Sequence, residues 1–256
     1  MKGSLALAAV LLCPTAFAGQ PSPIDEIRAC LTANLPRAAR IQTIEMTSWD
    51  RTGGQRTLKG RVFAARDRDQ PRLMARVDFP RDVAGTSVLV READPKTEVY
   101  VYLPSYKRVR RLYGTSTSGK LWGTDFSYDE FRRISNAFTD TDLELAGAGQ
   151  YEGRDAHVLT LTARPELQQR ETVRVLVDRQ TCVPLQAEFE NAGSVRKRMT
   201  VPVAALRQAG RGWYAGEMLL QDLGAGTRTR VKVIGVTPAE KLSAGYFNPA
   251  LFHSAH

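Results

Sequence analysis

Residues 97–134 have the sequence TEVYVYLPSYKRVRRLYGTSTSGKLWGTDFSYDEFRRI, which contains two strand patterns, a glycine-bounded loop and a capped helix. Val99, Val101 and Leu103 alternate with other residues up to Pro104, which predicts a strand that ends at the proline. A second strand rich in arginine and lysine follows. We interpret the whole stretch as a binding surface with a movable flap, because nothing in it resembles catalytic equipment.

The flap and the helix form the second half of this stretch. The flap is the loop 114–123, which begins and ends with glycine. Ser127 followed by Glu130 is a capping box, and apolar or aromatic residues then recur at helical spacing. Capping and placement in the first turn also account for Asp125, Asp129 and Glu130, which could otherwise suggest a metal site.

The first 18 residues have the pattern of a secretory signal peptide. Lys2 supplies the positive start, a short apolar run follows, and Ala16-Phe17-Ala18 gives the small-x-small cleavage pattern. We therefore expect cleavage after Ala18, export to the periplasm, and a single mature domain over residues 19–256. Cys13 leaves the alternative of a lipid-modified N-terminus, although a leucine precedes it where a small residue would be wanted.

Composition limits the partners of the protein. The chain carries 36 basic and 27 acidic residues, a formal net charge of +9, of which Lys2 is lost with the leader. An exported protein does not meet nucleic acid, so anionic lipid head groups or an acidic protein face are the expected partners of this charge. The length suits one all-β domain, and we expect a monomer.

Two cysteines remain after cleavage, Cys30 and Cys182. In an oxidising compartment a lone pair is expected to form a disulfide, which would tie the N-terminal helix to a strand near residue 182. Two buried free thiols are the alternative.

The mature chain begins with one helix and continues almost entirely as strands. Ser22 and Pro23 start a helix that Pro36 ends. From Ile41 onward the hydrophobic period is two, with turn residues between the runs, and the segment 213–220 is expected to be one strand. About ten or eleven short strands joined by hairpins predict a meandering antiparallel sheet or barrel.

Catalytic and metal-binding motifs are missing from the sequence. There is no HExxH, no CxxC and no Gly-x-Ser-x-Gly pattern. Of the three histidines, His157 lies inside a strand, and His253 and His256 lie in a tail that we expect to be disordered. We therefore expect no enzyme activity, no cofactor and no metal.

Four cations, which we call the basic patch, form the densest charge in the chain: Lys107, Arg108, Arg110 and Arg111. One interpretation is a solvated sheet edge that resists aggregation. The other is a docking surface for lipid phosphate or an acidic membrane partner. Neighbouring tyrosines favour an amphipathic rim over a plain charged face.

The segment 102–131, with the pattern YLP…RVRRL…GTDFSYDEF, resembles the exported outer-membrane lipoprotein-sorting-protein family, whose domain is LolA-like. The resemblance extends to segments on both sides and covers most of the mature chain. Trp122 and Phe131 are small departures from the family pattern. The central motif residues are Gly123, Thr124, Asp125, Phe126 and Tyr128.

The resemblance implies a mainly β fold: a curved antiparallel half-barrel of about eleven strands, with an N-terminal helix, and short helices and loops over the concave face. It also implies an apolar cavity that holds acyl chains, and it implies no catalytic residues. Alternation along the strands indicates candidate residues for the cavity wall. They are Val77, Phe79, Leu89, Val101, Leu103, Leu159, Leu161 and Val175.

The favoured hypothesis is a periplasmic carrier or chaperone that shelters a lipid, or the acyl chains of a lipoprotein, for transfer toward the outer membrane. The alternative is an accessory or regulatory module that carries no cargo. Such a module would bind an inner-membrane transporter of the resistance-nodulation-division type or an envelope signalling protein.

Overall fold

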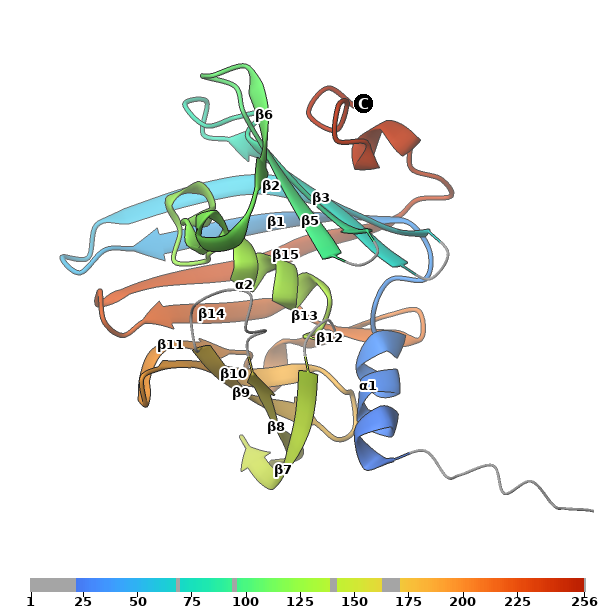
Figure 1. Ribbon diagram of the computed structural model, residues 1–256, viewed down its shortest axis with the longest axis vertical. Helices are drawn as coiled ribbons and strands as arrows, with labels where there is room; N and C mark the ends of the chain where they lie inside the picture. The colour runs from blue at the N-terminus through green and yellow to red at the C-terminus, as the bar shows by residue number, and fades with distance from the viewer. Residues whose placement is uncertain (1–21, 68–69, 94–95, 139–141, 163–170, 256) are drawn as a thin grey trace, which may run out of the picture.

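One curved antiparallel sheet makes up most of the protein (Figure 1). The computed structural model describes residues 22–67, 70–93, 96–138, 142–162 and 171–255. The expected signal peptide and His256 lie outside these residues. Among the described helices, none is long and apolar enough to cross a membrane.

The elements have the following bounds: α1 (Pro23–Ala33), β1 (Arg40–Trp49), β2 (Gln55–Asp67), β3 (Gln70–Phe79), β4 (Ser87–Ala93), β5 (Lys96–Leu103), β6 (Arg108–Leu112), η1 (Gly114–Ser118), η2 (Leu121–Gly123), α2 (Tyr128–Ser135), β7 (Asp142–Tyr151), β8 (Arg154–Thr162), β9 (Glu171–Asp178), β10 (Pro184–Asn191), β11 (Ser194–Thr200), η4 (Val203–Ala205), β12 (Leu206–Ala209), β13 (Gly212–Ala215), β14 (Glu217–Asp222), β15 (Thr227–Pro238) and η5 (Ala244–Phe247).

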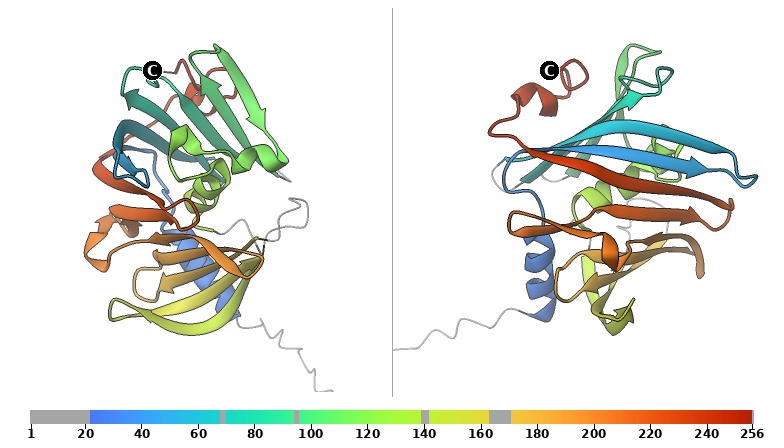
Figure 2. Two further views of the ribbon diagram at one scale, coloured as in Figure 1. Left: turned by 90° about the vertical axis from the view of Figure 1, so that its left-hand side faces the viewer. Right: turned by 180° about the vertical axis from the view of Figure 1, so that it is seen from behind.

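Two meanders build the sheet. Strands β1 to β6 pair in sequence order, strands β7 to β11 do the same, and β14 and β15 join the two series by pairing with β11 and β1. Figure 2 shows the result as an open half-barrel, with β6 and β7 at its two edges. The predicted mainly β half-barrel is confirmed. The described part of the sheet has thirteen strands, against about eleven expected, and the short strands β6 and β14 are among them.

The segment 213–220 is not one strand, so that prediction is wrong. The chain breaks at Gly216, which separates β13 from β14, and β13 pairs with β12 in a small separate hairpin. The Gly216 amide donates to the carbonyl of Ala205 at 2.8 Å. A Cβ at Gly216 would lie 2.9 Å from that carbonyl oxygen, closer than side chains are normally found, so the crossing needs glycine.

Both faces of the first meander are covered. The concave face holds the larger core, and the convex face of β2 to β4 carries a second cluster made by Phe63, Met74 and Leu89. Phe247 and Phe252 complete this second cluster, and they belong to residues 244–255, which we call the C-terminal segment. The C-terminal segment therefore belongs to the packed structure.

The expected disorder of the tail is accordingly wrong for His253. Its ring stacks on Tyr102 with centroids 4.2 Å apart. Arg76 of β3 holds the same segment by donating to the carbonyls of Phe252 and Ala255 at 2.7 and 3.0 Å. Alternation along β3 and β4 puts apolar residues on both faces, and the second face requires a cover.

Helix α1 closes one end of the half-barrel. Ser22 is its N-cap, Ile27 and Leu31 are buried, and the predicted Cys30–Cys182 disulfide joins the helix to the β9–β10 turn. Asn34, just after the helix, donates to the carbonyl of Thr181 at 2.6 Å. Its side-chain oxygen accepts from the amide of Trp213 at 2.9 Å.

Asp178 fixes the β9–β10 turn that carries Cys182. Its carboxylate is fully buried and accepts hydrogen bonds from Arg154 and from the amide and hydroxyl of Thr181. Burial acts to raise the pKa of Asp178, but these hydrogen bonds outweigh it and hold the pKa below its ordinary value. The turn is therefore held by a charged group that stays ionised.

Candidate ligand cavity

A short segment, residues 120–138, fills the concave face, and we call it the plug (Figure 2). It contains η2 and α2. The predicted capping box at the start of α2 is present: Ser127 Oγ accepts from the Glu130 amide at 3.1 Å, and Glu130 Oε2 accepts from the Ser127 amide at 2.7 Å.

Asp125 fastens the plug to β15. Its carboxylate accepts from the hydroxyls of Thr227 and Thr229 at 2.5 and 2.6 Å, and its own amide donates to Thr229 Oγ1 at 3.0 Å. Asp125 is only 3% exposed. The interpretation of Asp125 as a helix-capping acid is therefore wrong, because it reaches across the concave face instead of turning back to α2.

Two ion pairs fasten the plug to the second meander. Lys197 of β11 binds Glu130 at 3.0 Å and also donates to the carbonyl of Asp125 at 2.7 Å. Arg133 pairs with Asp129 in its own helix and with Glu171 of β9, at 2.7 and 3.1 Å. Burial raises the pKa of Glu171, and the charge of Arg133 offsets only part of that rise. The plug is thus joined to β9, β11 and β15.

A cavity of about 230 Å³ lies between the plug, the central strands and the β12–β13 hairpin. Most of its wall is apolar, and none of the described lining residues is an aspartate or a glutamate. The wall includes Ile44 and Met46 of β1, Val62 and Ala64 of β2, Val231 and Val233 of β15, and Leu121, Phe126, Ile134 and Phe138 of the plug.

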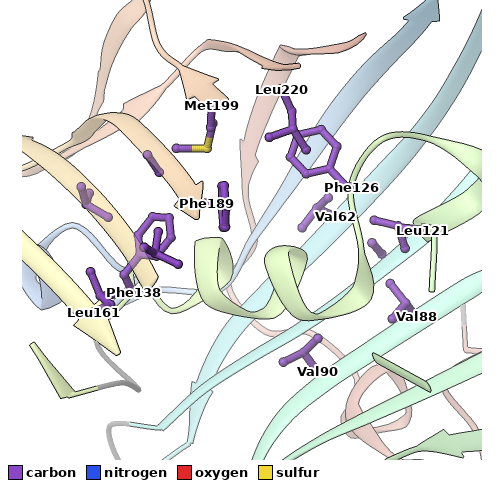
Figure 3. Close-up of a cluster of buried hydrophobic side chains, with 14 of the residues drawn as sticks. Val62, Val88, Val90, Leu121, Phe126, Phe138, Leu161, Phe189, Met199 and Leu220 are labelled. Carbon is purple, nitrogen blue, oxygen red and sulfur yellow. The ribbon is translucent and has the colours of Figure 1, made fainter. Parts of the chain in front are cut away.

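The plug packs into the core at both of its ends. Figure 3 shows Phe138 beside Leu161 at one end of α2, and Phe126 near Leu220 and Val62 at the other. Phe126 and Phe138 are 3% and 2% exposed. The helix between them is held by these two aromatic anchors as well as by its polar bonds.

Trp122 is an unusual residue in the cavity wall. Its backbone is left-handed (φ 55°), which is rare for a bulky side chain and is often found at functional sites. It is 9% exposed, and its indole N–H is buried with no acceptor among the described residues. The loop 114–123, expected to be a flap, is not exposed throughout, since Leu121 and Trp122 are buried.

None of the eight residues selected by strand parity lines this cavity. Leu89 lies on the convex face, because Val88 and Val90 face the concave core. Phe79 is 52% exposed beyond a register shift opposite Lys59 and Gly60. The other six lie in or against the concave core: Val77, Val101, Leu103, Leu159, Leu161 and Val175.

The wall residues of β1 follow an alternation that was visible in the sequence. Gln42, Ile44 and Met46 are every second residue of β1 and all line the cavity. The sequence alone does not show which strands lie at the centre of the sheet, and this is needed to predict the cavity wall. That depends on the pairing of β1 with β15, almost two hundred residues away, and no local pattern encodes it.

The basic patch is divided between the two faces of edge strand β6 and the turn before it. All four side chains are exposed. Arg110 and Arg108 pair with Val101 and Leu103, on the concave side, whereas Arg111 pairs with Tyr100 on the convex side. Arg111 also forms an ion pair with Glu98 at 2.9 Å.

The five residues of the central motif all belong to the plug. Gly123 is left-handed (φ 77°), the Thr124 hydroxyl donates to the Leu121 carbonyl, and Phe126 lines the cavity. Burial raises the pKa of Tyr128. The motif therefore encodes the fastening of the plug. No group of three or more His, Cys, Asp or Glu side chains within the described ranges is placed to hold a metal.

Three solved structures from different bacteria share this fold. A DUF1329 family protein from Desulfovibrio piger is 20% identical with a TM-score of 0.78, and the match covers 88% of this chain and 96% of that one. A putative outer membrane lipoprotein-sorting protein domain from Vibrio parahaemolyticus is 22% identical with a TM-score of 0.78, covering 89% and 97%. A LolA superfamily protein from Nitrosomonas europaea is 16% identical with a TM-score of 0.69, covering 88% and 96%.

Sequence comparison identifies the family. No curated protein matches the chain. A family model described as "-like: Uncharacterized protein" matches residues 69–253, well over half of the chain, including the plug and most of the sheet. The chain belongs to this family, and its fold is that of the outer-membrane lipoprotein-sorting, LolA-like proteins.

Proposed function

We propose that the protein is a periplasmic carrier or chaperone that shelters a lipid, or the acyl chains of a lipoprotein, for transfer toward the outer membrane. The observation that carries this proposal is the apolar cavity beneath the plug. An acyl chain in water costs about 0.8 kcal/mol per CH₂, so a carrier must bury the chain in an apolar space with a cover. The protein supplies both, and the proposal requires no catalytic group.

The size of the cavity limits what it holds with the plug in place. Its volume of about 230 Å³ lies just below the roughly 300–1,000 Å³ of pockets that enclose drug-sized ligands. One chain, or part of one, suits this space, and a larger cargo requires the plug to move. In that open state the concave-core residues selected by parity would be reached, and they remain predicted contacts of a larger ligand.

The proposed location in the periplasm has two supports. The first is the leader pattern, and the second is the Cys30–Cys182 disulfide, since such bonds persist in oxidising compartments. The fold neighbours named as lipoprotein-sorting and LolA superfamily proteins agree with this location.

Filling the cavity should weaken ligand binding. Ala64 lines the cavity on β2 and is 2% exposed, so the Ala64→Phe side chain would occupy the ligand's space. We expect the affinity of delipidated protein for a fluorescent fatty acid to fall at least tenfold. Overpacking costs roughly 1–3 kcal/mol of stability, so the fold is checked by circular dichroism and thermal melting.

The matched control is Thr43→Phe, which adds the same ring at an exposed position of neighbouring strand β1. It should bind the fluorescent fatty acid like the unmodified protein.

Mass spectrometry of protein isolated from the periplasm should also detect bound lipid. Delipidated protein that takes up no fatty acid or lipopeptide would contradict the carrier proposal, and a folded Ala64→Phe variant with full affinity would place the ligand elsewhere.

A second candidate function is an accessory module that binds a membrane transporter or an envelope signalling protein. The edge strand β6 favours it, because its outer edge pairs with no described strand and is flanked by Tyr106 and Tyr113, which are 64% and 63% exposed. The basic patch lies on the same edge. Its proposed partner is an anionic membrane surface or an acidic protein face.

Reversing the charges on the concave side of β6 tests this role. Each cation near an anionic membrane contributes about 1 kcal/mol, so Arg108→Glu with Arg110→Glu should weaken binding to phosphatidylglycerol vesicles at least tenfold. Fatty-acid uptake should be unchanged. The control is Arg211→Glu, at an exposed position outside the patch. Unchanged binding to vesicles, together with unchanged recovery of partner proteins, would remove the docking role.

A further inference from the structure

Arg40 places a positive charge in the wall of the apolar cavity. It is the first residue of β1, and it shares a strand face with Gln42 and Ile44, which also line the cavity. Its guanidinium carbon lies 5.9 Å from the ring centre of Tyr214, another wall residue. The side chain is half-buried, and its Nε is fully buried without an acceptor among the described residues.

This cation has no anionic partner within the described part of the chain. Some other arginines of the sheet have an acidic partner, such as Arg61 with Asp78 at 2.8 Å and Arg198 with Glu188 at 2.9 Å. Arg40 forms no such pair, and no described residue of the cavity wall is acidic. Burial lowers the pKa of Arg40, and Tyr214 acts in the opposite direction. Burying a charge without a partner is costly, so the site is electrostatically incomplete.

The other polar groups around Arg40 do not complete it. Asn34 lines the cavity nearby in sequence, but its amide and its oxygen are bound to Thr181 and Trp213. A second unsatisfied group of the wall, the buried indole N–H of Trp122, is also a donor. Both unsatisfied groups are donors, so an acceptor brought into the cavity by a ligand would satisfy them.

We infer that the cavity takes a single-chain amphiphile whose anionic head group, a carboxylate or a phosphate, is bound by Arg40. The inference rests on the proposed carrier function and specifies its ligand. The chain would lie along β1 from Arg40 toward Met46, a distance of roughly 20 Å at about 3.3 Å per residue. A guanidinium suits either head group, because its planar donors bind two oxygens at once.

The test compares three probes with one chain length: dodecanoate, dodecyl phosphate and uncharged dodecanol. Delipidated protein at pH 8 should bind at least one of the anions at least tenfold more tightly than dodecanol, measured by displacement of a fluorescent fatty acid. Arg40→Gln should remove this preference without weakening dodecanol binding, and Arg40→Lys should keep part of it. Arg37→Gln, which removes an exposed arginine three residues earlier, is the control and should keep it all.

The comparison of the three probes and the variants distinguishes the possible outcomes. Whichever anion binds more tightly identifies the head group, whereas acetate and inorganic phosphate alone should not displace the probe at the same concentrations. Equal affinity for all three probes in the unmodified protein, or an Arg40→Gln variant that keeps the preference, overturns the head-group inference and leaves the carrier function standing. Failure of all three probes to bind contradicts the carrier function itself. Melting curves of each variant confirm that it is folded.

Discussion

Replacing Cys30 and Cys182 with alanine is expected to lower the free energy of unfolding by about 4–5 kcal/mol. The disulfide joins residues 152 positions apart, and in the chain-entropy model a cross-link over such a long loop restricts the unfolded chain strongly. It also holds α1 at the end of the half-barrel, beside the cavity wall that contains Cys182. Urea denaturation of the oxidised protein and of the variant measures the difference.

Reduction provides the internal control. Dithiothreitol should destabilise the unmodified protein by a similar amount and leave the Cys30→Ala, Cys182→Ala variant unaffected. Free thiols must become detectable in the reduced protein. If the urea midpoint of the unmodified protein is then the same with and without dithiothreitol, the cross-link does not contribute to stability.

Releasing Asp125 should loosen the plug. Asp125→Ala removes the acceptor of two buried or half-buried threonine hydroxyls on β15, and hydrogen bonds to a charged group contribute about 1.5–3 kcal/mol each. We expect a loss of about 3 kcal/mol of stability, together with faster exchange of a bound fatty acid. Hydrogen exchange should show less protection of the α2 amides in this variant.

Asp82→Ala is the matched control for Asp125. It also removes one carboxylate, but Asp82 is exposed and pairs with Arg56 at only 3.4 Å. Such surface pairs contribute about 0–1 kcal/mol, so the stability of this control should hardly change. If Asp125→Ala left both α2 protection and ligand exchange as in the control, the bond from the plug to β15 would have no part in closing the cavity.

Much of the fold could be predicted because its signals are local. The period-two pattern with hairpin turns indicates an antiparallel meander, and Ser127 with Glu130 identifies the start of α2. The cysteine pair could be foreseen from the compartment implied by the leader. The break at Gly216 escaped prediction, since the reason for it is a carbonyl contributed by Ala205 from a preceding turn.

The cavity wall was harder to predict than the fold. Parity along a strand separates two faces, but it does not say which face is concave or which strands are central. Leu89 illustrates the first problem, because β4 is apolar on both faces, and the C-terminal segment covers the face that carries Leu89. Asp125 illustrates a separate problem. Its position just before a helix suggested that it caps that helix, but its hydrogen-bond partners lie on β15, about a hundred residues away.

Among the described strands, β6 and β7 each lack a partner on one side, and this has a mechanical consequence. In a closed barrel the ladder fixes the diameter, whereas a trough open between β6 and β7 can widen with every strand pair intact. The plug follows β6 along the chain, but its polar bonds go to β9, β11 and β15. It is therefore a strut across the trough, and each of those bonds limits how far the two meanders can spread.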